Sequence, residues 1–133
     1  ITGTQESGES AFKDGKTPIY NNDPSAAFYS LSFAAANIQK KGITSADFVT
    51  GYAKSNCFED VAETVTYYVV HQDDFRARAK KSPVLAKKLV WVEMYVFPGG
   101  RSLAQQEGPE FTKIPWDATK LAYSWKLDEV AAR

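Results

Sequence analysis

The sequence of 133 residues predicts a mainly α-helical protein. Residues 57–71 and 83–97 carry this prediction, because apolar side chains recur in both with the spacing of a helix that buries one face. Both segments also start with residues that favour the first turn of a helix. Asn56 precedes the first segment, and Ser82 followed by Pro83 begins the second.

A short connection separates the two predicted helices, so we expect them to pack against each other. The apolar residues assigned to this contact, in chain order, are Phe58, Val61, Val65, Val69, Leu85, Leu89 and Val92. Ala62 and Tyr68 extend the apolar stripe of the first helix. Lys87 and Lys88 are placed on the solvated side of the second helix.

The segment before the first long helix is less regular. Residues 1–25 are rich in small and polar side chains, which predicts a loop-rich lead-in to a helical lobe covering residues 26–133. Residues 26–33 are apolar and aromatic, and so short a run fits either a strand or the start of a helix. A capped turn over residues 44–48 then leads to Tyr52 in the loop before the first long helix.

Three further segments complete the predicted order. An Asp cap favours a short helix over residues 73–80. Residues 98–115 contain Gly, Gln and Pro and predict a loop. A final amphipathic helix is expected over residues 117–129, docked onto the core.

Length, charge and cysteine content exclude several classes of protein. A chain of 133 residues corresponds to one domain or to a fragment of one. Its 16 basic residues balance 16 acidic ones, so no net charge attracts nucleic acid or an anionic membrane, and no apolar run is long enough to span a bilayer. The single cysteine, Cys57, excludes an internal disulfide and is expected to be buried and inert.

Glu59 and Glu63 stand four residues apart and therefore project from one side of the first helix. Two like charges at this spacing repel each other, and a metal ion or a cationic partner would give the helix a reason to keep both. The alternative is structural. Asn56 with Glu59 three residues later resembles a capping box, and a carboxylate in the first turn interacts favourably with the helix dipole.

Tyr52, Asn56 and the sequence EDVAE at residues 59–63 resemble a segment of the gluzincins, zinc metallopeptidases related to anthrax toxin lethal factor. In that family a Tyr stands seven residues before the Glu that begins a Glu-x-x-Ala-Glu helix. Tyr52 and Glu59 have this spacing. The likeness covers residues 28–97.

This resemblance implies that the chain is the C-terminal helical lobe of a zincin-like metallopeptidase domain. Glu59 would be the third zinc ligand, and Tyr52 would donate a hydrogen bond to the oxyanion formed during peptide-bond hydrolysis. Glu63, with Asp60 as a further member, would orient a zinc-bound His through its free ring N–H. The implied cofactor is zinc, the implied substrate is a peptide or protein, and we expect a secreted or extracellular protein.

Members of this family also carry a His-Glu-x-x-His helix, whose two His bind zinc while the Glu acts as general base. This chain has one His, His71, which lies about 18 Å from Glu59 along the helix axis and is expected to sit at the helix C-terminus rather than to bind metal. We therefore expect a C-terminal portion of a peptidase that works with the missing N-terminal part of the same protein. Alone, it is expected to bind zinc weakly or not at all and to be inactive.

The alternative is a non-catalytic helical module for interaction with a partner, which has lost or never had the metal site. On this hypothesis Glu59 is a cap and Glu63 is solvated. Exposed aromatic side chains then form the interface, and the candidates are Tyr67, Trp91 and Tyr95.

Overall fold

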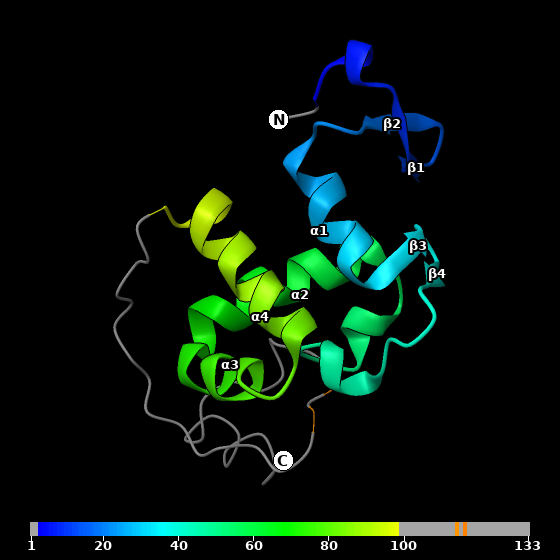
Figure 1. Cartoon of the computed structure of the whole chain (residues 1–133). Helices are drawn as coiled ribbons and strands as arrows, with labels where there is room; N and C mark the ends of the chain where they lie inside the picture. Colours follow the sequence, from blue (N-terminus) through cyan, green and yellow to red (C-terminus); the bar gives the residue numbers. More distant parts are fainter. Residues whose placement is uncertain (1–2, 99–113, 115, 117–133) are drawn as a thin grey trace, which may run out of the picture.

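The computed structural model describes residues 3–98, 114 and 116 of the chain (Figure 1). Helices dominate, which confirms the mainly α-helical class. They are α1 (Pro24–Ser32), α2 (Cys57–Val70), α3 (Gln72–Ala79) and α4 (Pro83–Trp91). The strands are β1 (Glu9–Asp14), β2 (Thr17–Tyr20), β3 (Phe33–Ala35) and β4 (Ile38–Gln39). Shorter helical turns are η1 (Gln5–Ser7), η2 (Ser45–Asp47), η3 (Tyr52–Lys54) and the π-helix η4 (Val92–Val96).

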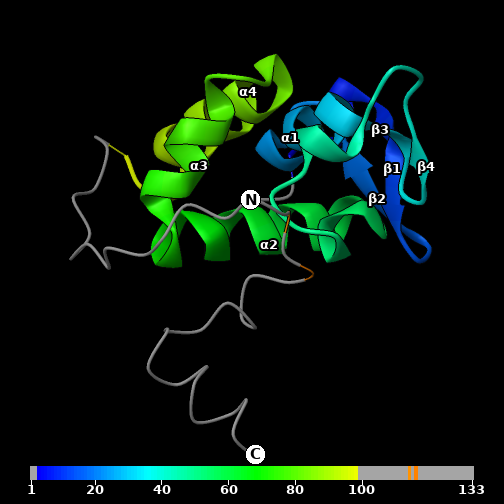
Figure 2. The same ribbon diagram turned by 90° about the horizontal axis from the view of Figure 1, so that it is seen from below.

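The helices enclose an aromatic core. α2 runs along one side of the molecule, and α1 and α3 both pack against it (Figure 2). α4 follows α3 and contacts both α3 and α1. The largest fully buried aromatic side chains are Phe28, Phe33, Phe48, Tyr67, Tyr68 and Phe75. Burying such rings is the largest favourable contribution to the stability of a domain of this size.

The N-terminal segment contains a β-hairpin where the sequence predicted mainly loop. β1 and β2 pair antiparallel, and Gly15 in their turn has a φ of 63°, which glycine adopts without steric cost. Phe12 is the one buried residue of β1, and its ring lies 5.4 Å from that of Tyr29. Because a single inward side chain anchors the strand, the sequence lacks the alternating pattern that would have predicted it.

Residues 26–33, for which the sequence allowed either a strand or the start of a helix, belong mostly to the helix α1. Asp23 caps the helix by accepting a hydrogen bond of 2.8 Å from the backbone N–H of Ser25, and Pro24 occupies the first helical position. The apolar run is therefore helical through Ser32, and the chain then enters the short strand β3 at Phe33.

α2 begins at the predicted residue and ends at Val70, one residue before the predicted end, but it buries a different face. The Asn56 side chain accepts from the backbone N–H groups of Phe58 and Glu59 at 3.0 and 2.9 Å, which fixes the start of the helix. Val69, assigned to the buried stripe, is 44% exposed. The side chains that are buried on α2 are Cys57, Asp60, Glu63, Thr64, Tyr67 and Tyr68. Phe58, Val61 and Val65 pack at the margin of the core.

The second predicted helix is confirmed as α4 followed by the π-helix η4. Ser82 accepts a hydrogen bond of 3.0 Å from the N–H of Leu85, and Pro83 follows it at the first helical position. The placement of Lys88 on the solvated side was wrong, because its side chain is fully buried. This segment contacts α2 through η4, which carries the predicted core residue Val92, and through the Lys88 side chain.

The predicted loop over residues 98–115 and the predicted helix over residues 117–129 lie outside the described residues, apart from residues 98 and 114. Trp116 is described, and its carbonyl accepts a hydrogen bond of 2.6 Å from the Tyr52 backbone. Within the described part of the chain, no helix is both long and apolar enough to cross a membrane.

Candidate functional site

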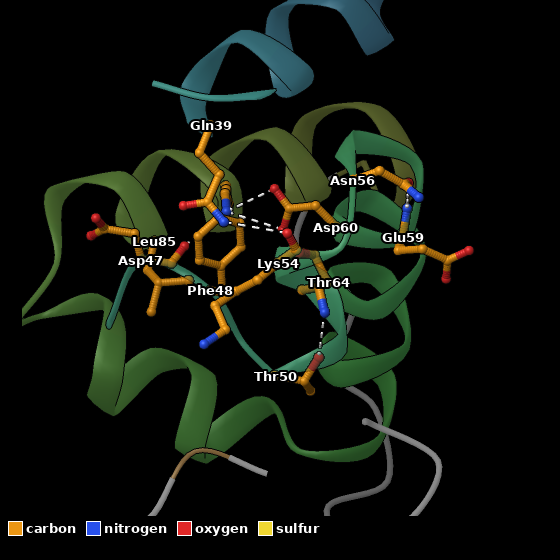
Figure 3. Close-up of polar contacts among 12 residues, drawn as sticks. Gln39, Asp47, Phe48, Thr50, Lys54, Asn56, Glu59, Asp60, Thr64 and Leu85 are labelled. Atoms are coloured by element: carbon orange, nitrogen blue, oxygen red, sulfur yellow. Dashed lines mark hydrogen bonds and ion pairs between the residues drawn. The ribbon is translucent and has the colours of Figure 1, made fainter. Parts of the chain in front are cut away.

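Glu59 lies in the first turn of α2, where the cap by Asn56 holds its backbone. Its side chain is partly exposed and points away from the core between the helices (Figure 3). The next residue, Asp60, points inward on the same helix (Figure 3). One turn of α2 therefore presents one carboxylate outward and one inward.

Tyr52 begins η3, the short helical turn that packs against α2. Its side chain is 37% exposed, and its ring centroid lies 6.0 Å from that of Trp116. A Cβ at the neighbouring Gly51 would come within 2.8 Å of the Trp116 ring, so glycine is required for this close approach. Tyr52 and Glu59 thus occupy two elements in direct contact.

Glu63 is buried and bound to the chain segment that leads to Tyr52. Its carboxylate accepts a hydrogen bond of 2.8 Å from the hydroxyl of Thr50, and the same hydroxyl accepts from the backbone N–H of Ala53 at 3.2 Å. The side chain is only 7% exposed, so the solvated Glu63 of the interaction-module hypothesis was wrong. The contact ties α2 to the start of η3.

Asp60 forms an ion pair with Lys88 in the protein interior. Lys88 Nζ lies 2.9 Å from Asp60 Oδ2 and donates to Oδ1 at 3.1 Å, with both side chains fully buried. Thr64 Oγ1 donates to the same carboxylate at 3.4 Å. Burial raises the pKa of Asp60 to about 6 and lowers the pKa of Lys88, while each charge opposes the shift of the other.

The Lys88 ammonium also reaches the loop before Tyr52. It donates a hydrogen bond of 2.8 Å to the carbonyl of Asp47 and lies 4.3 Å from the centroid of the Phe48 ring. The sequence contained a signal for this burial. Lys88 stands three residues after Leu85 and four before Val92, a spacing that places all three on one helix face.

Tyr67, Asp74 and Arg78 form a second internal polar cluster. Tyr67, which the interaction-module hypothesis placed at an exposed interface, is fully buried and donates its hydroxyl to Asp74. Burial and this carboxylate raise the pKa of Tyr67. The Arg78 guanidinium lies 3.6 Å from Asp74 and donates to the carbonyls of Val49, at 2.8 Å, and Phe48.

His71 and Cys57 occupy structural positions. His71 joins α2 to α3, as its place at the helix C-terminus predicted, and its ring centroid lies 5.1 Å from that of Tyr67. Cys57 is fully buried, as predicted, and burial raises the pKa of its thiol to about 12. A thiol in this state is a poor nucleophile and a poor metal ligand.

The described residues do not by themselves make a zinc site. No group of three or more His, Cys, Asp or Glu side chains within residues 3–98, 114 and 116 lies close enough to hold a metal ion. A protein zinc site uses at least three such ligands. Of the sequence-predicted residues, the structure brings Tyr52 and Glu59 onto adjacent elements and directs Asp60 and Glu63 to internal partners.

No family model, no curated protein and no solved structure matches this chain.

Proposed function

We propose that the chain is the C-terminal portion of a zinc-dependent peptidase. In this proposal Glu59 supplies one carboxylate ligand to zinc, and Tyr52 supplies a phenolic hydroxyl that meets the oxyanion of the substrate. Tyr52, Asn56 and residues 59–63 resemble the gluzincins in order and spacing, which supports these roles.

The observation that supports it best is the different environment of neighbouring carboxylates on α2. Asp60 and Glu63 are buried and bound to Lys88 and Thr50, so structural roles account for them. Glu59 is held on a capped, anchored turn and yet faces outward (Figure 3). A carboxylate carried by a fixed helical turn and directed away from the core suits a ligand that meets a group from another part of the protein.

Zinc in such a site would lower the pKa of a bound water and polarise the scissile carbonyl. The remaining zinc ligands would come from a His-Glu-x-x-His segment outside these 133 residues. Within the chain, Glu59 would bind zinc and Tyr52 would bind the substrate oxyanion, while Asp60 and Glu63 would support the elements that carry them.

Zinc content and turnover of the full-length protein test the assignment. Glu59→Gln keeps the shape of the side chain and removes the charge, so we expect it to lose zinc and activity while the fold remains. Asp73→Asn is the matched control, because Asp73 is an exposed carboxylate in the first turn of α3. Zinc at wild-type occupancy in Glu59→Gln would end the ligand assignment.

The interaction module remains as a second candidate because α4 and η4 expose apolar side chains. Val90 and Met94 lie four residues apart on one face and are 56% and 57% exposed, and Tyr95 adjoins them. If this surface binds a protein partner, Met94→Lys should abolish binding without changing zinc content. Loss of turnover in Tyr52→Phe with partner binding intact would favour the peptidase instead.

A further inference from the structure

Three consecutive backbone carbonyls just before Tyr52 accept hydrogen bonds from buried or partly buried cations. Lys88 of α4 donates to the carbonyl of Asp47 at 2.8 Å. Arg78 of α3 donates to the next two, those of Phe48 and Val49. A loop with successive carbonyls bound in this way has little freedom to shift, because each contact is directional and charge-assisted.

Lys88 differs from Arg78 because it also holds the helix that carries Glu59. The same ammonium that binds the Asp47 carbonyl contacts both oxygens of Asp60, which is the residue after Glu59. One buried cation therefore joins the loop leading to Tyr52 with the first turns of α2. Thr50 adds a parallel link from this loop to Glu63 on the next turn of the helix.

A contribution to stability does not by itself explain why the protein buries the Lys88–Asp60 ion pair. Removing a Lys and an Asp from water is costly, and well-packed apolar side chains of the same size are often equally or more stabilising. The ion pair provides what an apolar contact lacks, which is a defined distance and direction between two segments. A second contact fixes the same loop to α4, because Ser82 at the start of that helix donates a hydrogen bond of 2.7 Å to the side chain of Asp47.

We propose that Lys88 is a positioning residue that holds Tyr52 at a fixed place relative to Glu59. The inference rests on the proposed peptidase function, in which these two side chains act on one substrate. Lys88 itself is fully buried and acts only through the loop and the helix that it joins. Displacing a reacting group by about 1 Å is enough to lower a rate on the order of 10²-fold.

The test uses the full-length protein with both charges of the pair removed, Lys88→Met with Asp60→Asn, because Lys88→Met alone leaves a buried carboxylate without its cation. We expect zinc to be retained, kcat to fall roughly 10- to 100-fold and KM to change much less. In a Tyr52→Phe background the same pair of substitutions should have no further effect on kcat. Arg76→Gln is the matched control, because Arg76 of α3 pairs with Glu93 of η4 and not with the loop before Tyr52 or with Asp60.

Backbone amide exchange gives a readout that does not depend on activity. In the zinc-free protein the paired variant should exchange faster at residues 50–54, where Ala53 and Lys54 donate to Thr50 and Gly51, whereas Arg76→Gln should not. The inference would be overturned if the paired variant kept both the wild-type amide exchange and the wild-type kcat. It would also be overturned if the paired substitutions lowered kcat as much in the Tyr52→Phe background as in the wild-type protein. If Tyr52→Phe and Glu59→Gln leave turnover and zinc unchanged, the proposed function fails, and exchange alone then tests whether Lys88 positions the loop.

Discussion

Lys88→Met should be strongly destabilising, and the structure explains the size of the effect. Met is similar in length to Lys, so the packing of the aliphatic part of the side chain is largely kept, whereas the ammonium that lies 4.3 Å from the centroid of the Phe48 ring is removed. What is lost is the charge that balances Asp60, and removing one partner of a fully buried pair costs about 3–5 kcal/mol. Lys88→Met with Asp60→Asn should cost less, because no uncompensated charge stays in the interior.

The loss of folding stability in Lys88→Met should also depend on pH. Burial already raises the pKa of Asp60 from 3.8 to about 6 although Lys88 opposes the rise. Without the ammonium this folded-state pKa moves higher still, while the unfolded-state value does not change. A carboxyl with a raised folded-state pKa stabilises the fold when protonated and loses that contribution as the pH rises through its folded-state pKa. The single variant should therefore be more stable near pH 5 than near pH 8.

Urea denaturation at both pH values measures the effect. With a slope of about 1.5 kcal/mol per molar urea, a loss of about 3–5 kcal/mol lowers the midpoint by roughly 2–3 M. Lys87→Met is the control on the exposed neighbour and should shift stability by less than about 0.5 kcal/mol. A Lys88→Met midpoint close to that of the control, or equal losses at the two pH values, would refute the role of the buried charge.

Three further outcomes follow from the site. The Cys57 thiol should resist alkylation at pH 8 in the folded protein and react after denaturation, because it is buried and its pKa is raised to about 12; rapid modification of the folded form would contradict its burial. Tyr52→Phe should keep zinc in the full-length protein and lower turnover by roughly 10²–10³-fold, and unchanged turnover would remove the oxyanion role. The 133-residue chain alone should show no tight zinc site in calorimetry, because one carboxylate cannot hold the metal; a sub-micromolar one-to-one site would argue against the ligand assignment.

Local sequence signals determined the helix boundaries. Asn56 and Ser82 accept hydrogen bonds from backbone N–H groups two or three residues ahead, so the caps that begin α2 and α4 are recognisable from a few neighbouring letters. The same signals placed Tyr52 just before α2 and Glu59 in its first turn. Their roles in binding zinc and substrate remain predictions.

Only the tertiary structure decided which face of α2 is buried. Asp60, Glu63 and Tyr67 face inward because each meets a polar partner, and those partners are Lys88, Thr50 and Asp74. The partners of Asp60 and Glu63 come from other elements, at separations of 28 and 13 residues. Hydrophobic periodicity reports where the apolar side chains of one element lie. It carries no information about distant hydrogen-bond partners, and a polar side chain can be buried at low cost only where such a partner is present.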